Sequence, residues 1–253
     1  MEERGSFLIQ PGGRIGNGAF GYVEHVQLLT LSKANCSGNY ARKVFSPSIN
    51  VDIVSFKKRF RKEVISQDTC RHKNVAPIYL CNLEAENPWF IMGLAIQDLQ
   101  SEIDSKSLSL SDKIKILNMI LSGINHIHKK GYIHRDIKPN NILKYLDNNE
   151  IIYKISDFGL IKNTNPKENT EILTALNVVM GTDTYRAPEI IYSAKYSFQS
   201  DVFALGMLMK ALKFENASIE PVIKKSTEFE LENRYNTVEE IIEDIAEINW
   251  GQI

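Results

Sequence analysis

Three short motifs that lie far apart along the chain constrain its fold more than any other feature. Glycines punctuate residues 16–23, which read Gly-Asn-Gly-Ala-Phe-Gly-Tyr-Val. Much later the chain reads His-Arg-Asp-Ile-Lys-Pro-Asn-Asn over residues 134–141, and Asp-Phe-Gly follows at 157–159. Main-chain N–H groups of a glycine-rich turn can approach phosphate oxygens, and the oxygens of Asp and Asn suit Mg²⁺. The chain is therefore predicted to bring these motifs together around a metal-bound phosphate group.

The first hundred residues show the alternation of apolar and polar side chains that is typical of half-buried strands. Two short strand patterns flank a glycine turn at Gly12 and Gly13, and a turn-forming cluster around Gly38 predicts a hairpin loop. A single helix is expected at 51–69, where apolar residues recur among many cations. The expected strands lie at 7–9, 14–15, 22–31, 41–45, 76–83 and 89–94.

Beyond residue 100 the pattern becomes helical. Ser111 and Asp112 are predicted to cap a long helix that Gly131 ends. Its apolar residues recur at helical spacing and are Ile114, Leu117, Ile120, Leu121, Ile124 and Ile127. Short strands are expected at 133–134 and 153–155, and further helices near 201–212, 219–226 and 238–248. The sequence predicts an α+β fold in which residues 1–253 form one domain, with a β-rich lobe over about 1–94 and a mainly helical lobe over about 95–253.

Charge and composition exclude several classes of protein. The formal net charge of -1 argues against a dedicated nucleic-acid binder, which is usually basic. No apolar run approaches the roughly 20 residues that a membrane-spanning helix needs. The three cysteines, Cys36, Cys70 and Cys81, lack CxxC spacing and predict a reducing, cytoplasmic compartment, with a nuclear or host-cell location also compatible.

The glycine motif has a rival interpretation as a dinucleotide-binding turn. That fold requires a helix directly after the glycines and an acidic residue about 20 positions later. Here a strand pattern follows the glycines, and Lys43 lies near that distance. Gly16, Gly18 and Gly21 are therefore predicted to hold phosphates in a turn between two strands.

The motif at 134–141 carries the strongest chemical signal. Asp136 is placed to accept or orient the proton of an attacking hydroxyl, and Lys138 supplies a cation where negative charge builds on a transferring phosphoryl group. Asn141 and Asp157 are predicted to coordinate Mg²⁺ together. His134 is better explained as a packed structural histidine than as an acid or base.

Together with Ala-Arg-Lys at 41–43 and Ala-Pro-Glu at 187–189, these motifs resemble the eukaryotic-type protein kinase family over nearly the whole chain. A lysine two residues after the aspartate, here Lys138 after Asp136, resembles the pattern of the Ser/Thr class of that family. The resemblance implies a bilobal kinase fold and an ATP- and Mg²⁺-dependent transfer of the γ-phosphoryl group to Ser or Thr hydroxyls of protein substrates.

The resemblance also assigns individual residues. Lys43 would hold the α- and β-phosphates and would be paired by Glu63 from the following helix. Met92 would lie behind the adenine, Leu143 beneath it and Asp98 near the ribose. The residues implied in nucleotide binding are Ile15, Gly16, Asn17, Gly18, Ala19, Phe20, Gly21, Val23, Ala41, Lys43, Met92, Gly93, Ala95, Asp98 and Leu143.

Further roles follow from the resemblance in the second half of the chain. Thr182 would contact Asp136 and Lys138, and Asp201 would brace the loop that carries them. Arg234 would form a buried ion pair with Glu189.

Regulation by phosphate is a hypothesis of the same kind. Arg135 directly precedes Asp136, as in kinases whose activation segment is ordered by a phosphate. We expect activity to rise when Thr164, Thr170 or Thr174 is phosphorylated, by an activating kinase or by trans-autophosphorylation. The phosphate would meet Arg135 and the cations Lys57, Lys58, Arg59, Arg61 and Lys62, although a solvated helix face explains those cations equally well.

Two departures from the family pattern are visible. Residues 213–218 leave no room for a helix that usually follows the one at 201–212, which predicts a compact kinase. Gln67 stands where an apolar residue usually stacks with those matching Ile78, His134 and Phe158, and a buried amide costs free energy unless it is hydrogen-bonded. These departures support an alternative function, a pseudokinase-like nucleotide-binding scaffold that acts through protein contacts. A small-molecule kinase is a third possibility, which the segment 181–189 disfavours.

Overall fold

A computed structural model describes the chain except for residues 19, 37, 48–51, 165–182 and 252–253. The chain divides into two compact units. The N-terminal unit comprises residues 1–71 and 76–96, and the C-terminal unit comprises 72–75 and 97–253. The boundary therefore falls two residues later than the sequence predicts, and a four-residue segment ahead of it belongs to the C-terminal unit.

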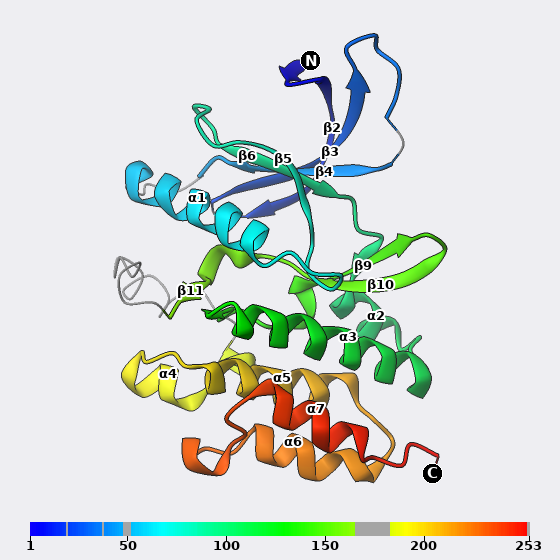
Figure 1. Cartoon of the computed structure of the whole chain (residues 1–253), viewed down its shortest axis with the longest axis vertical. Helices are drawn as coiled ribbons and strands as arrows, with labels where there is room; N and C mark the ends of the chain where they lie inside the picture. The colour runs from blue at the N-terminus through cyan, green and yellow to red at the C-terminus, as the bar shows by residue number, and fades with distance from the viewer. Residues whose placement is uncertain (19, 37, 48–51, 165–182, 252–253) are drawn as a thin grey trace. The chain divides into compact units, whose positions relative to one another are not determined.

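The N-terminal unit is a six-stranded antiparallel sheet with one helix, α1 (Figure 1). The strand order is β1-β2-β3-β4-β6-β5, with bounds Glu2–Arg4, Phe7–Gly18, Gly21–Thr30, Tyr40–Phe45, Trp89–Gly93 and Ile78–Asn82. The sheet curls, and Arg4 Nε of one edge strand donates to the Cys81 carbonyl oxygen of the other at 3.1 Å. The β-rich character predicted for this region is confirmed.

Alternating side chains of the central strands fill two separate cores on the two faces of the sheet. Val44 and Trp89 enter one core, whereas their neighbours Phe45 and Phe90 enter the other. The first core is purely sheet-built, with Ile9, Val26, Leu28 and Ile91 as its other members. The second is closed by Phe60 and Val64 of α1. Helix α1 runs Ile53–Thr69, close to the predicted bounds, and the Asp52 side chain caps its first turn.

The predicted glycine turn at Gly12 and Gly13 was wrong. Strand β2 runs through these residues without a break, and its pairing with β3 shifts register on either side of Arg14. A Cβ atom on Gly12 would lie 2.9 Å from His25 Nδ1 and 3.0 Å from the His25 carbonyl oxygen, so any larger residue in the bulged strand would displace His25. The glycines therefore serve a bulge, which local sequence alone does not distinguish from a turn.

Strand β1 was not predicted at all. Glu2 accepts hydrogen bonds from Arg42 at 2.8 Å and from Trp89 Nε1 at 3.0 Å. Arg42 also donates to Glu24 at 2.7 Å, and both of these side chains are buried. The first strand is thus held by an ion-pair network that reaches β3, β4 and β6.

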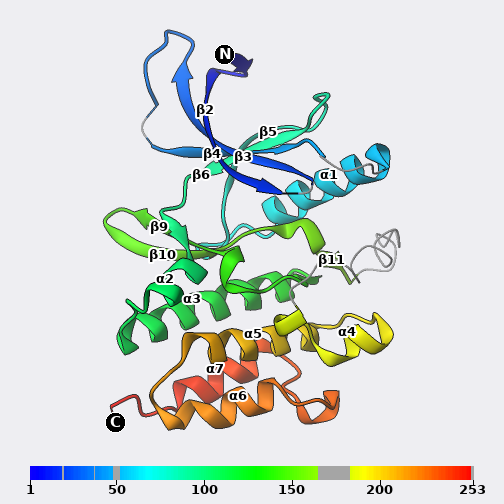
Figure 2. The ribbon, with the colours of Figure 1, turned by 180° about the vertical axis from the view of Figure 1, so that it is seen from behind.

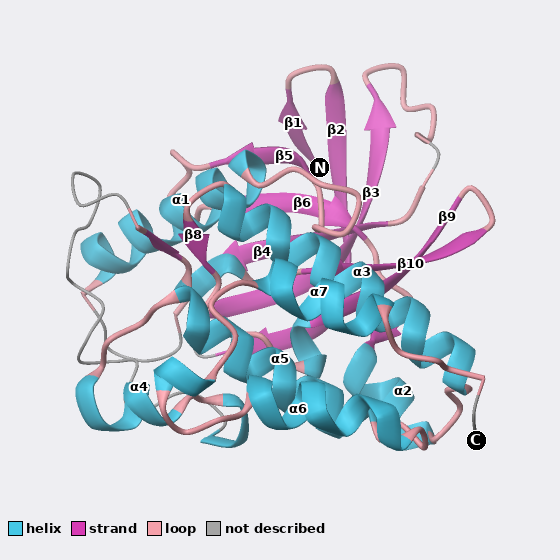
Figure 3. Cartoon of the chain, turned by 60° about the horizontal axis from the view of Figure 1, so that its bottom comes forward, coloured by secondary structure: helices cyan, strands magenta, loops and turns pink. Residues whose placement is uncertain are grey.

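Helices dominate the C-terminal unit, as predicted (Figures 2 and 3). They are α2 Leu99–Ser105, α3 Leu110–Lys129, α4 Pro188–Ser193, α5 Phe198–Leu212, α6 Glu220–Ser226 and α7 Val238–Ala246. Helix α3 contacts both α5 and α7, and α6 packs against α5 and α7. Buried apolar side chains of α3 recur at helical spacing and include Leu117, Leu121 and Ile124, as predicted.

The start of α3 lies earlier than predicted. Ser109 is the N-cap, and it forms a capping box with Asp112, whose carboxylate accepts from the Ser109 backbone N–H. The helix ends where predicted, because Gly131 takes a left-handed conformation with φ 79°.

Two small sheets complete this unit. One has the order β10-β9-β7, with bounds Glu150–Ile155, Ile142–Asp147 and Gln97–Asp98. The other pairs β11 (Lys162–Asn163) with β8 (Tyr132–Ile133). The β9–β10 hairpin was only partly predicted, although Asn148 and Asn149 both take the positive φ that a tight two-residue turn needs.

The connection between α5 and α6 is short, as the sequence indicates. Residues 213–219 hold one 3₁₀ turn, Ala217–Ile219. Phe214 of this connection contacts the Trp250 ring, with centroids 5.6 Å apart.

Candidate active site

The glycine motif forms the end of the β2–β3 hairpin. Gly18 pairs with Gly21 at the end of the two strands. A Cβ atom on Gly16 or Gly18 would meet nothing closer than 3.8 Å, whereas one on Gly21 would lie 2.0 Å from the Val44 carbonyl oxygen. Gly21 is therefore required by packing against β4, and only the other two leave open space beside the backbone.

The tip of this hairpin is tied to its surroundings through Phe20. Its carbonyl oxygen accepts from the Ser46 N–H at 3.0 Å, and its ring stacks on Phe56 of α1 with centroids 4.8 Å apart. Arg59 lies over both rings at 5.7 and 5.8 Å. Ala19 lies outside the described residues.

Lys43 sits in the middle of the sheet and faces α1. It pairs with Val23 on β3 and with Phe90 on β6. Its Nζ lies 2.6 Å from Glu63 Oε1, and the Glu63 side chain is only 6% exposed. This places a buried carboxylate against the lysine that the sequence predicts to hold phosphates.

The other predicted adenine residues of this unit share the same sheet. Ala41 pairs with Met92 across β4 and β6, and Gly16 pairs with Val23 across β2 and β3. Ile15 is 54% exposed. Gly93 ends β6, and Ala95 follows it in the last residues of the unit.

Only the amide nitrogen of Gln67 has a hydrogen bond among the described residues. Its Nε2 donates to the Ala76 carbonyl oxygen at 2.8 Å. Its Oε1 is buried and, among the described residues, has no hydrogen-bond partner. The predicted cost of burying this side chain is therefore partly offset.

The loop at 134–141 gathers three functional side chains in the C-terminal unit. Lys138 Nζ lies 3.0 and 2.9 Å from the two carboxylate oxygens of Asp136. Asn141 Nδ2 donates at 2.8 Å to the same carboxylate and at 2.8 Å to the Asp136 carbonyl oxygen. Because the Asn141 amide nitrogen is engaged, its amide oxygen is the atom that suits a hard cation.

Ser156, which lies between β10 and the Asp-Phe-Gly motif, holds Asp157 next to Asn141. The N–H and the hydroxyl of Ser156 both donate to the Asn141 carbonyl oxygen, at 2.8 and 3.0 Å. Asp157 takes a left-handed conformation with φ 60°. Phe158 is fully buried and meets the His134 ring edge-on, with centroids 5.1 Å apart. An amide oxygen and a carboxylate on adjoining backbone make a donor set that fits Mg²⁺.

Asp201 of α5 fixes the backbone of this loop from below. It accepts from the His134 N–H at 2.8 Å, from the Arg135 N–H at 2.9 Å and from His128 Nε2 at 2.8 Å. Burial alone would raise the pKa of Asp201, but the bond from His128 and the neighbouring positive groups hold it below its usual value. The carboxylate therefore stays ionised, and its three hydrogen bonds hold the loop as the resemblance implies for Asp201.

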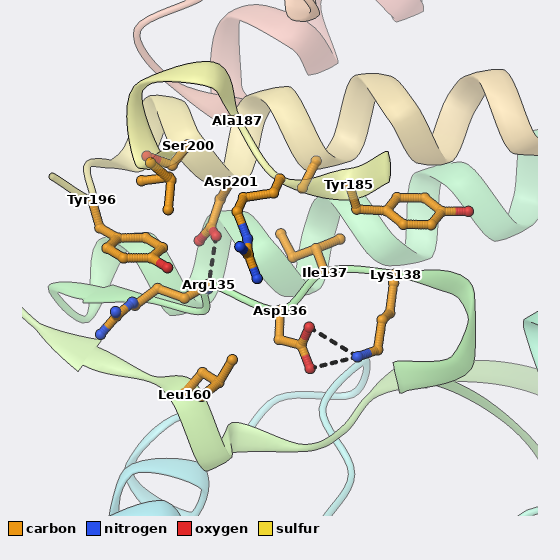
Figure 4. A pocket seen from close by; sticks show the side chains of 13 residues that line it. Arg135, Asp136, Ile137, Lys138, Leu160, Tyr185, Ala187, Tyr196, Ser200 and Asp201 are labelled. Carbon is orange, nitrogen blue, oxygen red and sulfur yellow. Dashed lines mark hydrogen bonds and ion pairs between the residues drawn. The ribbon is translucent and has the colours of Figure 1, made fainter. Parts of the chain in front are cut away.

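Arg135 is the strained residue of the loop. It has φ 72°, a left-handed conformation that costs free energy outside glycine. Its guanidinium lies 3.6 Å from the centre of the Tyr196 ring. Figure 4 shows this pair on one side of a pocket, with Asp136 and Lys138 facing each other on another side. Tyr185 and Ala187 also line the pocket.

Glu189 and Arg234 form the predicted ion pair. Arg234 Nη1 and Nη2 lie 3.0 and 3.2 Å from the two carboxylate oxygens, and the arginine side chain is fully buried. Arg234 also donates to the carbonyl oxygens of Gln199 at 2.9 Å and Glu228 at 2.8 Å. Arg234 thus joins α4, which carries Glu189, to α5 and to the loop that follows α6.

Asp98 and Leu143 are brought together in the C-terminal unit, where they pair across β7 and β9. Asn140 Nδ2 lies 3.4 Å from Asp98 Oδ2. Thr164 is exposed, and its hydroxyl donates to the Gly131 carbonyl oxygen at 2.9 Å. The predictions for Thr170, Thr174 and Thr182 lie outside the described residues.

Three contributors were not predicted, namely His128, Ser156 and Tyr196. Ser156 directly precedes the Asp-Phe-Gly motif, so its position was a usable signal. His128 and Tyr196 act through Asp201 and Arg135, which are far from them in sequence. Such contacts leave no local pattern.

One buried and two half-buried histidines make stability depend on pH. Burial lowers the pKa of His134, His72 and His126, and the stacked His72–His126 pair lowers it further for His72. A histidine with a depressed pKa binds its proton more readily when unfolded, so stability is full above the ordinary value of 6.5 and falls as the pH drops below it. We expect a lower melting temperature at about pH 5.5 than at about pH 7.5, and a shallower fall in a His72→Asn/His126→Asn variant. Equal melting temperatures at both pH values would contradict this.

The protein kinase domain family matches residues 9–251 of the chain. The chain belongs to the protein kinase family. It is 31% identical over 249 residues to the serine/threonine-protein kinase CHK1 of Saccharomyces cerevisiae, covering 95% of this chain and 43% of that one. It is 28% identical over 218 residues to CBL-interacting protein kinase 14 of Oryza sativa subsp. japonica, covering 84% and 47%. It is also 28% identical over 161 residues to the serine/threonine-protein kinase ste20 of Aspergillus fumigatus, covering 63% and 19%.

This kinase chain spans less than half the length of each of these relatives. The bilobal, α+β kinase fold and the Ser/Thr class that the sequence predicts are confirmed. Among the residues that the structure describes, none of the kinase's helices is both long and apolar enough to cross a bilayer.

Proposed function

We propose that residues 1–253 form one kinase domain that transfers the γ-phosphoryl group of ATP to Ser or Thr hydroxyls of protein substrates with the help of Mg²⁺. The observation that carries this proposal is the Asp136 carboxylate, held by Lys138 and Asn141 within one loop. A carboxylate fixed in this way can orient the attacking hydroxyl and take up its proton. The three cysteines, Cys36, Cys70 and Cys81, lack CxxC spacing and support a reducing, cytoplasmic location.

The remaining residues take the roles that the resemblance implies. Asn141 and Asp157 would hold Mg²⁺, which supplies positive charge to the phosphate oxygens when it is bound. Lys43, paired with Glu63, would hold the α- and β-phosphates, and Lys138 would stabilise charge on the transferring group. The main chain at Gly16 and Gly18 would approach the phosphates, and the fold itself does not require glycine at either position, because a Cβ atom there would meet nothing closer than 3.8 Å.

An assay with radiolabelled ATP tests the proposal. Wild-type protein should label itself or a generic protein substrate in the presence of Mg²⁺, whereas Asp136→Asn and Lys43→Ala should not. A wild type that binds ATP without any labelled protein product would favour the scaffold function instead. Labelling of a small molecule but of no protein would favour a small-molecule kinase.

Regulation through the segment that precedes residue 187 is part of the proposal. Arg135 and the cations of α1 would meet a phosphate on Thr164, Thr170 or Thr174, attached by an activating kinase or in trans. Some of these cations already have partners: Arg61 donates to Glu84 at 2.8 Å, and Arg59 lies over Phe20. The same assay, run before and after phosphatase treatment, tests this regulation. Activity should fall after the treatment, and equal activity would exclude the regulation.

The glycines offer a matched set of variants. Gly18→Ala should fold normally, because its Cβ atom would meet only Gly21 O at 3.8 Å, but it should raise KM for ATP by narrowing the approach to the backbone. Gly21→Ala should instead lower stability, because its Cβ atom would lie 2.0 Å from Val44 O. Thermal melting and ATP kinetics of both variants check this. A stable Gly21→Ala protein would contradict the steric argument, and an unchanged KM in Gly18→Ala would contradict the phosphate role.

A further inference from the structure

A buried polar cluster lies between α2 and the β7–β9–β10 sheet. It consists of Glu102, Lys144 and Tyr153, which we call the Glu102 cluster. The Glu102 side chain is only 3% exposed, Lys144 Nζ lies 2.5 Å from its Oε1, and Tyr153 Oη donates to its Oε2 at 2.7 Å. Burial and the bond to Glu102 raise the pKa of Tyr153, so its hydroxyl keeps its proton and donates. Each carboxylate oxygen therefore has its own donor.

Strand register places this cluster behind the predicted nucleotide residues. Lys144 pairs with Tyr153 on β10 and with Gln97 on β7, so these three side chains share one face of the sheet. Leu143 is the preceding residue of β9 and pairs with Asp98, so both lie on the opposite face. The Glu102 cluster thus supports the strand pair that carries Leu143 and Asp98.

Helix α2 is a second connection between the Glu102 cluster and Asp98, in addition to the strand pairing. Asp98 is the N-cap of α2, and its carboxylate accepts from the N–H and the hydroxyl of Ser101 at 2.8 and 2.7 Å. Glu102 belongs to the first turn of the same helix. Its bond to Lys144 therefore fixes that turn against β9, and with it the position of Asp98 relative to Leu143.

The Glu102–Lys144 ion pair fixes the position of α2 on β9 more specifically than apolar packing would. A buried ion pair is often no more stabilising than apolar residues of similar volume, but it is directional and can specify one register. Leucine-like side chains at these positions would tolerate sliding of α2 along β9. The retained charges point to a demand for one fixed arrangement.

We propose that Glu102, Lys144 and Tyr153 are positioning residues that set ATP affinity by holding Leu143 and Asp98 in one register. The inference rests on the proposed function, because it takes Leu143 and Asp98 to contact the adenine and the ribose. Small displacements of binding groups are costly, since a shift of about 1 Å can change a rate by about 100-fold.

Kinetics and direct binding test the inference. Glu102→Gln, Lys144→Met and Tyr153→Phe should each raise KM for ATP and the Kd of ATP measured by calorimetry, by about tenfold for the first two. The kcat at saturating ATP and KM for the protein substrate should change less than about twofold, because the Lys138 and Asn141 side chains that hold the Asp136 carboxylate keep their hydrogen bonds in these variants. Lys144→Arg should restore much of the ATP affinity, since it keeps the charge and the donor.

A matched control is the other tyrosine–carboxylate pair of this unit. Tyr235 donates to Asp244 of α7, and Tyr235→Phe should leave KM for ATP at the wild-type value. Wild-type KM and Kd in folded Glu102→Gln and Tyr153→Phe would overturn the inference, as would a loss of kcat and melting temperature with KM unchanged. A wild-type protein that neither binds nor consumes ATP would instead overturn the proposed function.

Discussion

Replacing Asp136 with asparagine should lower kcat by about 10²–10⁴-fold, the usual contribution of a positioned general base. The side chain keeps its size, and it keeps an oxygen that can accept from Lys138 or Asn141, whose nitrogens lie 2.9 and 2.8 Å from Asp136 Oδ2. The amide cannot take up a proton from a hydroxyl. KM for ATP should therefore change little, and steady-state kinetics with a protein substrate measures the split between the two parameters.

Asp68→Asn is the matched control for this variant. Asp68 forms an exposed ion pair with Arg71, at 2.5 Å, and such pairs contribute about 0–1 kcal/mol. It should keep wild-type activity. An Asp136→Asn protein that retains more than about a tenth of the wild-type kcat would contradict the role proposed for Asp136.

The largest loss of stability is expected from Arg234→Met. The variant keeps the aliphatic part of the side chain but leaves Glu189 and the carbonyl oxygens of Gln199 and Glu228 without their donor. Breaking a buried pair from one side costs about 3–5 kcal/mol, which corresponds to a fall of about 6–20 °C in melting temperature for a chain of this size. Thermal unfolding monitored by circular dichroism measures this.

Two further variants test whether the loss of stability in Arg234→Met comes from the buried ion pair. Arg234→Met/Glu189→Gln should be more stable than Arg234→Met alone, because the uncompensated charge is gone. Glu239→Gln removes a half-exposed partner of Lys129 and should lower the melting temperature far less than Arg234→Met, because exposed ion pairs contribute little to stability. A melting temperature of Arg234→Met within about 2 °C of the wild type would contradict the prediction.

Local patterns predicted the elements that carry their own signal. The alternation in β3 and the helical spacing in α3 each express burial on one face, so their positions followed from periodicity. The loop at 134–141 was predictable because Asp136, Lys138 and Asn141 lie close together in sequence and need only one short loop to meet.

Elements that depend on distant partners were not predictable. Strand β1 contains two glutamates and an arginine, and its stability comes from Arg42 and Trp89. Helix α2 is short and depends on contacts with β9. Glu102 and Tyr196 gave no local signal for the same reason, because each acts on a residue far away along the chain.

The placement of Trp89 has a practical consequence. The chain contains two tryptophans, one in each unit, and the indole of Trp89 is 3% exposed with Glu2 as its hydrogen-bond acceptor. Replacing Trp250 with phenylalanine would leave Trp89 as the single tryptophan, and its emission, excited at a wavelength that tyrosine does not absorb, would report on the sheet alone. Replacing Trp89 would do the same for the helical unit. Emission spectra of the two proteins during denaturant titration would then show whether both units melt in one cooperative transition, without any external label.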